Sequence, residues 1–203
     1  MADKTALVVI DMQNGFCWRP AGGLQEKMGW PALINVPAVV EHNAALIAAA
    51  RERGIPVVYV RYETLPDMLN AMRIHREAAA AVGLPAGTSF AMEGSEGEIV
   101  AEIAPQPGDY VVSKTRWDAF LYTNLEPLLA GLGVVNLVMS GVLTNACVET
   151  TARAALQRNF RVWVAKDCVT SETEQLHENA LLSMSSLGAV IADGKRALDE
   201  ATA

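Results

Sequence analysis

The sequence predicts an α/β protein, a three-layer α/β/α sandwich around a six-stranded, mainly parallel sheet. Of its 203 residues, 51% are hydrophobic and only 19% are charged, which is typical of a folded chain with a large core. Six short segments are apolar without alternation, a pattern typical of strands buried on both faces. Segments with helical signals separate these strands, as parallel pairing requires.

The first part of the chain contains two predicted strands and one long helix. The apolar run at residues 5–10 predicts the first strand. Residues 36–53 are predicted to be helical, because Pro37 suits a first helical turn and Gly54 is a stop signal. The run at residues 55–61 predicts the second strand.

Residues 63–93 have the weakest pattern in the chain. A helix is predicted over residues 65–82, and Gly83, Pro85 and Gly87 then interrupt regular structure. We therefore expect a helical excursion followed by a loop, which is a place suited to a lid or a subunit contact.

The second half continues the alternation of helices and strands. Helices are predicted over residues 97–104, 124–132, 146–158 and 172–187, and strands over residues 110–113, 134–140, 161–165 and 189–192. No internal repeat or linker-like tract separates these elements. We therefore expect residues 1–203 to form a single domain.

Charge and cysteine content narrow the expected partners and compartment. The formal net charge of −7 argues against nucleic acid or an anionic membrane as a partner. The first residues lack the pattern of a signal peptide, and no apolar run is long enough to span a bilayer. Three cysteines do not make a disulfide framework. These features predict a cytoplasmic protein.

Three reactive side chains follow predicted strands. Asp11 follows the first strand, Lys114 the third, and Cys147 follows the fourth and opens a helix. Ligands of an open parallel sheet bind outside the carboxyl ends of its strands. The three side chains are therefore predicted to meet at one rim of the sheet.

Cys147 is the candidate nucleophile of this rim. The free N–H groups of a first helical turn and a nearby Lys114 are expected to lower the pKa of the thiol. A thiolate can attack a carbonyl carbon, and Asp11 can carry the proton. The alternatives are a buried packing role for Cys147, a turn-forming role for Asp11 and a solvated charge for Lys114.

The remaining cysteines and histidines give weaker signals. Packing roles are expected for Cys17 and Cys168, because neither opens a helix beside a strand-end base. His42, His75 and His177 lack the spacing of metal ligands, while a Cys–His pair in space stays open. No Gly-x-Gly-x-x-Gly turn follows the first strand, which argues against a dinucleotide site. No metal and no cofactor are therefore expected.

With these residues in view, the sequence resembles the isochorismatase-like cysteine hydrolases. Three motifs carry the resemblance: Val-Val-Ile-Asp-Met-Gln-Asn at 8–14, Ser-Lys-Thr-Arg-Trp-Asp-Ala-Phe at 113–120, and Ser-Gly-Val-Leu-Thr-Asn-Ala-Cys-Val-Glu-Thr-Thr-Ala-Arg at 140–153. The resemblance covers residues 5–194. It implies a Rossmann-like sandwich that assembles as a homodimer or homotetramer.

The resemblance also implies roles for individual residues. Cys147 would attack the carbonyl carbon, Asp11 would act as base and acid, and Lys114 would steady the thiolate. A cis peptide bond would join Val142 and Leu143. The backbone N–H groups of Leu143 and Cys147 would form the oxyanion hole.

Differences between this sequence and the motifs of individual family branches narrow the class of reaction that the resemblance implies. Nicotinamidases carry histidine metal ligands after the second strand, whereas residues 61–66 contain no histidine. The isochorismatases proper lack the nucleophile, so Cys147 favours cleavage of a C–N bond. The last motif most resembles the ureido-amide branch, which includes ureidoacrylate amidohydrolase. A small amide, ureide or carbamoyl compound is the expected substrate, cleaved through a thioester.

Substrate-binding candidates come from the loops at the same rim. Phe16, Trp117 and Phe120 could form aromatic walls for a small planar amide. Thr144 and Asn145 could hydrogen bond to its carbonyl end. Core packing is the alternative for each aromatic residue.

Two arginines are candidates for binding a charged substrate group, and two other functions compete with the hydrolase interpretation. Arg61 or Arg116 could meet a substrate carboxylate, and a solvated surface charge is the alternative for each. A non-catalytic binding protein of the same fold is one competing function. A redox-sensing protein is another, and it would need a resolving cysteine near Cys147.

Overall fold

A computed structural model describes residues 4–65, 68–84 and 94–203, and it shows the predicted parallel sheet. Every paired strand runs parallel to its neighbours, in the order β3-β2-β1-β4-β5-β6. The strands are β1 (Lys4–Ile10), β2 (Val57–Tyr62), β3 (Tyr110–Lys114), β4 (Val134–Val142), β5 (Arg161–Thr170) and β6 (Val190–Ala192). The fold class predicted from the sequence is therefore confirmed.

Helices cover both faces of this sheet and lie beyond one of its ends. The α-helices are α1 (Asn14–Cys17), α2 (Leu24–Lys27), α3 (Val36–Glu52), α4 (Arg73–Ala81), α5 (Leu125–Leu132), α6 (Glu149–Gln157), α7 (Glu174–Ser186) and α8 (Gly194–Ala201). Two 3₁₀ turns, Gly94–Gly97 and Ala101–Ile103, and one π-helical turn, Thr144–Val148, complete the described elements.

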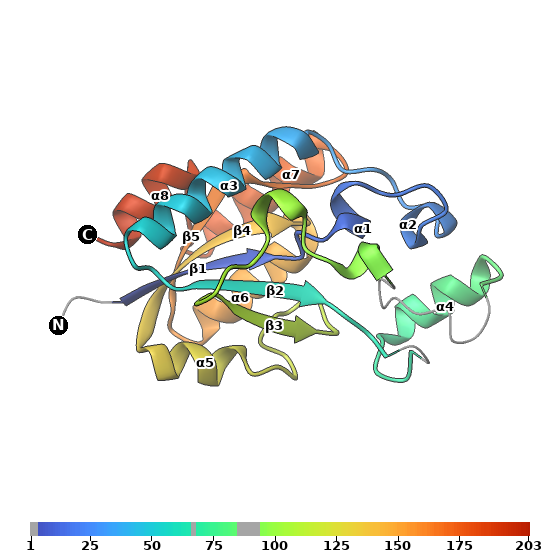
Figure 1. Cartoon of the computed structure of the whole chain (residues 1–203), viewed down its shortest axis with the longest axis horizontal. Coiled ribbons are helices and arrows are strands. Elements are labelled where there is room, and N and C mark those ends of the chain that lie inside the picture. Colours follow the sequence, from blue (N-terminus) through green and yellow to red (C-terminus); the bar gives the residue numbers. More distant parts are fainter. Residues whose placement is uncertain (1–3, 66–67, 85–93) are drawn as a thin grey trace.

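The two faces of the sheet bury separate sets of side chains. Along β1, Val8 and Ile10 pack with α5, α6 and α7, whereas Leu7 and Val9 pack with α3 and α8. Both sets are fully buried, which explains why the strand is apolar without alternation. Figure 1 shows α3 and α8 above the sheet and α5 and α6 below it.

The strand order reverses between β1 and β4, and this places the site. A crevice forms at such a switch point, outside the carboxyl ends of the strands. Figure 1 shows α1, α2 and α4 at this end of the molecule, and the two chain termini at the other. The excursions after β1 and β2 therefore face the ends of the strands that carry the candidate residues.

Several element boundaries differ from those predicted. β5 runs on to Thr170, so Asp167 and Cys168 lie within the strand and not after it. The helix predicted over residues 65–82 is confined to α4, and the predicted interruption at Pro85 and Gly87 lies outside the described residues. The terminal helix α8 was not predicted, although its buried residues Gly194, Ala197, Leu198 and Ala201 follow a helical spacing.

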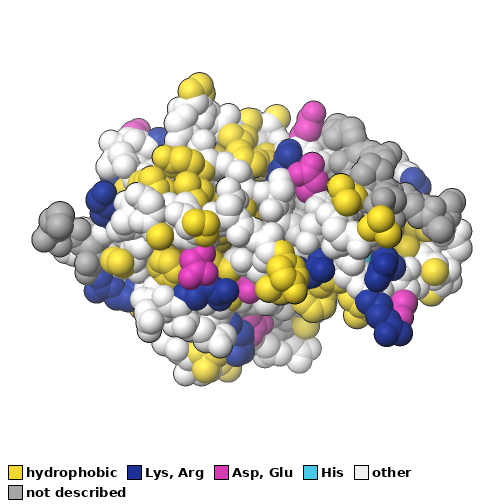
Figure 2. Space-filling view, turned by 90° about the horizontal axis from the view of Figure 1, so that it is seen from below, with side chains coloured by type: hydrophobic (Ala, Val, Ile, Leu, Met, Phe, Trp, Pro, Cys, Tyr) yellow, Lys and Arg dark blue, Asp and Glu magenta, His cyan; other side chains and the backbone are white. Residues whose placement is uncertain are grey.

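The surface carries dispersed apolar groups. β3 is an edge strand, and its Tyr110 and Val111 are exposed. Figure 2 views the side on which β3 and α5 lie, where hydrophobic side chains occur in several places with charged side chains between them. Within the described ranges, no helix is both long and apolar enough to cross a bilayer.

Candidate active site

Asp11 and Lys114 form a buried ion pair at the carboxyl end of the sheet. Asp11 directly follows β1, and Lys114 is the last residue of β3, in register with Tyr62 of the intervening β2. The Lys114 Nζ lies 2.6 Å from Asp11 Oδ2, and both side chains are essentially inaccessible to solvent. The same ammonium lies 5.1 Å from the centre of the Tyr62 ring. Strand geometry alone therefore brings together two residues 103 positions apart.

Cys147 reaches this pair from β4. The peptide bond between Val142 and Leu143 is cis, at the position that the family resemblance implies. The π-helical turn Thr144–Val148 follows and places the Cys147 thiol 3.3 Å from Lys114 Nζ. Lys114 also donates to the Arg116 carbonyl oxygen at 3.0 Å. Its three N–H donors are thus directed at the carboxylate, the thiol and a backbone oxygen.

Burial controls the protonation of the three groups. Burial raises the pKa of Asp11, while Lys114 and the Cys147 thiol oppose that shift. Burial also raises the pKa of Cys147 to about 12; the Asp11 charge adds to this rise and Lys114 opposes it. Burial lowers the pKa of Lys114, but the interactions with Asp11 and Cys147 together outweigh it and the net shift is upward.

The expectation of a lowered thiol pKa is therefore wrong for this structure. The prediction rested on a helix start and a lysine, and it ignored the desolvation of Cys147 and the nearby negative charge. At neutral pH the Cys147 thiol is therefore neutral, and it lies beside the Asp11–Lys114 pair. A base with a raised pKa next to a thiol is suited to taking the thiol proton as attack begins.

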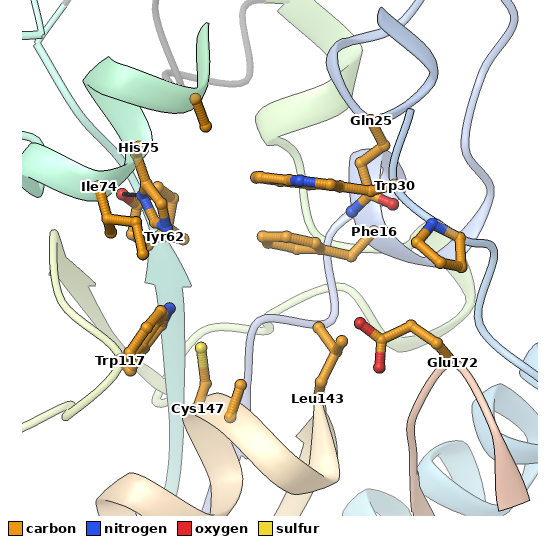
Figure 3. Close-up of a pocket in the computed structure, with 13 residues that line it drawn as sticks. Phe16, Gln25, Trp30, Tyr62, Ile74, His75, Trp117, Leu143, Cys147 and Glu172 are labelled. Carbon is orange, nitrogen blue, oxygen red and sulfur yellow. Dashed lines mark hydrogen bonds between the residues drawn. The ribbon is translucent and has the colours of Figure 1, made fainter. Parts of the chain in front are cut away.

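A cavity of about 370 Å³ opens above the Cys147 thiol. Its walls are mostly aromatic and apolar, and its lining residues are Phe16, Gln25, Trp30, Pro31, Tyr62, Ile74, His75, Ala78, Trp117, Leu143, Ala146, Cys147 and Glu172. In Figure 3 the Phe16 and Trp30 rings lie one above the other, facing Tyr62 and His75 across the cavity, with Cys147 below. A small planar molecule would fit between these walls with its reactive atom over the thiol.

Comparison with known proteins now identifies the family. The model of the isochorismatase domain matches residues 5–196. The chain belongs to the isochorismatase family.

Named relatives and solved structures in this family agree with that assignment. A ureidoacrylate amidohydrolase RutB of Pseudomonas savastanoi pv. phaseolicola is 34% identical over 163 residues, covering 74% of this chain and 64% of that relative. An isochorismatase family protein from Desulfovibrio vulgaris is 28% identical with a TM-score of 0.80, covering 98% of this chain and 97% of that one. The N-carbamoylsarcosine amidase of Thermoplasma acidophilum is 28% identical with a TM-score of 0.71, and the match covers 94% and 96% of the two chains.

The isochorismatase-family pocket holds two of the five substrate-binding candidates predicted from the sequence. Phe16 and Trp117 line it. Phe120 does not: it is buried in the core and stacks on Phe160, with ring centres 5.8 Å apart. The structure therefore does not place Phe120 in the pocket wall, because the loop after Lys114 turns this ring inward against α6.

Thr144 and Asn145 lie behind the pocket, where other side chains engage them. The Thr144 hydroxyl is 3.0 Å from the Nδ1 of His177 on α7, and Thr144 is fully buried. The Asn145 Oδ1 lies 2.6 Å from the Ser171 hydroxyl. Neither residue is among those that line the pocket. Both belong to the π-helical turn, and their contacts with His177 and Ser171 hold that turn in place.

The two arginines considered for a substrate carboxylate lie outside the pocket. Arg61 pairs with Glu63 at 2.9 Å on the surface. Arg116 donates to the Asn70 carbonyl oxygen at 2.7 Å and lies over the Tyr122 ring. Neither guanidinium lines the cavity.

The sequence analysis did not predict the pocket residues that come from the segments after β1 and β2. His75 comes from α4, and its ring centre lies 6.1 Å from those of both Trp30 and Trp117. The Tyr62 hydroxyl is 2.9 Å from His75 Nδ1, and burial lowers the pKa of His75 to about 4. The sequence did hold one signal for this wall of the pocket: Ile74 and Ala78 are four residues apart, and therefore lie on one face of the helix.

Cys17 and Cys168 are buried in the core cluster under α3, as expected for packing residues. Burial raises the pKa of both thiols. No group of three or more His, Cys, Asp or Glu side chains in the described part of the chain is placed to hold a metal ion. The absence of a metal requirement stays a prediction.

Proposed function

We propose that this isochorismatase-family protein is a metal-independent cysteine amidohydrolase that cleaves a C–N bond of a small amide, ureide or carbamoyl substrate. One observation carries the proposal. Lys114 contacts both Asp11 and Cys147, and Cys147 lines a cavity of small-molecule size. The names of the relatives, an amidohydrolase and an amidase, support the same class of reaction.

The first half of the reaction forms an acyl-enzyme. Asp11 takes the proton of the Cys147 thiol, and the sulfur attacks the carbonyl carbon. Lys114 stabilises the thiolate as it forms, because its ammonium lies 3.3 Å from the sulfur. The backbone N–H groups of Leu143 and Cys147 receive the oxyanion of the tetrahedral intermediate. Asp11 then returns its proton to the leaving nitrogen, the C–N bond breaks, and a thioester remains.

The second half hydrolyses that thioester. Asp11, again a carboxylate, removes a proton from water as the water oxygen attacks the thioester carbon. The tetrahedral intermediate collapses, the C–S bond breaks, and Asp11 returns the proton to the Cys147 sulfur. The net change is one water consumed, with ammonia or an amine and a carboxylic or carbamic acid released. A single residue moves every proton, so Lys114 can remain charged throughout.

Three other functions are known or conceivable for the same fold, and the experiment below distinguishes them from the proposed one. A nicotinamidase would need a metal site after β2, and an isochorismatase proper would not need Cys147. A non-catalytic binding protein would bind in the cavity without turnover.

The decisive experiment measures ammonia release from a panel of amides and ureides with EDTA present. The panel contains ureidoacrylate, biuret, N-carbamoyl amino acids, nicotinamide and benzamide. The proposal expects turnover that survives EDTA and falls at least about a thousandfold in Cys147→Ser and Cys147→Ala. Turnover that survives either substitution, or that disappears with EDTA, would contradict it. Circular dichroism and unfolding curves of both variants serve as folding controls.

We also propose that residues 1–203 form one domain of a cytoplasmic homodimer or homotetramer that takes no nucleic acid or membrane partner. Exposed leucines on and just after α7, Leu176, Leu182 and Leu187, support a subunit contact. Light scattering after size exclusion tests this, and a monomer at micromolar concentration would contradict it. A single unfolding transition is expected for one domain.

A further inference from the structure

Among the described residues that line the pocket, Glu172 is the one acidic side chain. It lies between the end of β5 and the start of α7, and it is half-buried. In Figure 3 its carboxylate lies on the side of the cavity opposite Trp117, with Cys147 and Leu143 between them. A substrate carbonyl over Cys147 would therefore have Trp117 on one side and a carboxylate on the other.

This carboxylate has a hydrogen-bond donor but no cationic partner in the described part of the chain. The Ser171 hydroxyl lies 2.8 Å from Glu172 Oε2. The same hydroxyl is 2.6 Å from Asn145 Oδ1, and its single proton serves one acceptor at a time. The described residues place no Lys, Arg or His nitrogen within ion-pair distance of Glu172.

The residues that the structure does not describe include no lysine or arginine that could reach the pocket. All 16 Lys and Arg residues lie in the described ranges, because residues 1–3, 66–67 and 85–93 contain neither type. No Lys or Arg is among the lining residues. The buried Lys114, which contacts Cys147, is paired with Asp11 at 2.6 Å. His75 is neutral at physiological pH, since burial lowers its pKa to about 4.

These charges favour one kind of ligand over another. A partly desolvated carboxylate among aromatic walls accepts hydrogen bonds from N–H groups and attracts a positive charge. A ligand carboxylate placed in the same cavity would add a second negative charge with no counter-charge to offset it. The electrostatics therefore oppose acidic substrates at this end of the pocket.

We propose that Glu172 is the specificity-determining residue, and that it selects small amides or ureides with N–H donors or a positive charge and without a carboxylate. The flat body of such a substrate would lie between the aromatic walls. This inference rests on the proposed amidohydrolase function and narrows its substrate class. It separates this chain from the ureidoacrylate amidohydrolase relative, whose named substrate is an acrylate.

The test compares three amides of similar shape: benzamide, 4-(aminomethyl)benzamide and 4-carboxybenzamide. The wild type is expected to give the highest kcat/KM on the cationic amide and the lowest on the anionic one. Glu172→Gln should reduce the cation-to-anion ratio about tenfold or more, chiefly through KM, and Glu172→Arg should invert the preference. Glu174→Gln is the matched control, because Glu174 is exposed on α7 and does not line this pocket. A ratio that Glu172→Gln leaves unchanged would overturn the proposal.

A second measurement does not depend on turnover. The rates at which iodoacetamide and iodoacetate alkylate Cys147 are measured by peptide mass, each relative to N-acetylcysteine. The wild type should disfavour the anionic reagent, and Glu172→Gln and Glu172→Arg should progressively remove that bias. If no amide is hydrolysed, the amidohydrolase function fails and the alkylation ratio alone decides the role of Glu172. A ratio that neither variant changes would overturn that role even in an active enzyme.

Discussion

The backbone of Gly141 lies directly against that of Ile10, so that a β-carbon at Gly141 would stand 2.0 Å from the Ile10 carbonyl oxygen. Gly141 also has a φ of +107°, which L side chains rarely adopt. This contact joins β4 to β1 next to Asp11 and just before the π-helical turn. It therefore fixes the separation between the nucleophile and its base.

We expect Gly141→Ala to destabilise the protein by at least about 3 kcal/mol and to remove activity, because strain and a backbone clash add. Gly108→Ala is the matched control, since Gly108 has a φ of +102° with no atom within 4 Å of an added β-carbon. Urea unfolding curves and amide turnover measure the two effects. Equal losses of stability in both variants would show that the Ile10 contact is unimportant.

The buried ion pair predicts a non-additive mutant series. Lys114→Met leaves the Asp11 carboxylate buried without its partner, which is expected to cost about 3–5 kcal/mol of stability. The double variant Asp11→Asn, Lys114→Met should regain much of this loss and stay inactive. A double-mutant cycle of unfolding free energies measures the coupling, and simple additivity would contradict the pairing.

The raised pKa of Cys147 predicts its chemical reactivity in the absence of substrate. With a pKa of about 12, the thiolate fraction grows with pH across the whole neutral range. The rate of alkylation by iodoacetamide should therefore still be rising at about pH 9, whereas a thiol with a lowered pKa would have reached a plateau. Lys114→Met should slow alkylation further, since Lys114 opposes the rise. A plateau near neutral pH would contradict the proposed neutral thiol.

The lowered pKa of His75 predicts a pH-dependent stability. The folded-state pKa is about 4, and the ordinary value is 6.5. Below pH 6.5 the unfolded chain binds a proton that the folded protein rejects, so this contribution to stability is lost as the pH falls toward 4. The loss should be about 1–2 kcal/mol, because the ring is partly exposed and water screens it. His75→Gln should flatten the curve of unfolding free energy between these pH values relative to the wild type.

The sheet and the reactive residues were predictable because both follow from local patterns. Apolar runs mark buried strands, and parallel pairing brings the residue after each strand to one edge, as it does for Asp11 and Lys114. The pKa of Cys147 was not predictable in this way, because desolvation depends on tertiary burial. Phe120 was misplaced for a similar reason: its inward orientation depends on contact with Phe160, 40 residues away.

The segments that follow β1 and β2 were the least predictable part of the site. His75 lies on the short helix α4 and Trp30 in the loop after α2, and the position of both segments depends on tertiary contacts. Their sequences lack strong start and stop signals. Glu172 was overlooked because its significance lies in what surrounds it. A single acidic residue in a loop is ordinary, and only the structure shows that no cation accompanies it.

The pocket is built from two kinds of chain segment, strand ends and connecting segments, which evolution can change independently. Cys147 and its two partners sit on strand ends and the turn after β4, where a replacement would disturb the sheet itself. Trp30, His75 and Glu172 sit on connecting segments, where substitutions and length changes leave the sheet intact. Relatives can thus inherit the same reaction while acquiring new substrates, and an engineer could redirect this protein by rebuilding its connections and leaving its strands untouched.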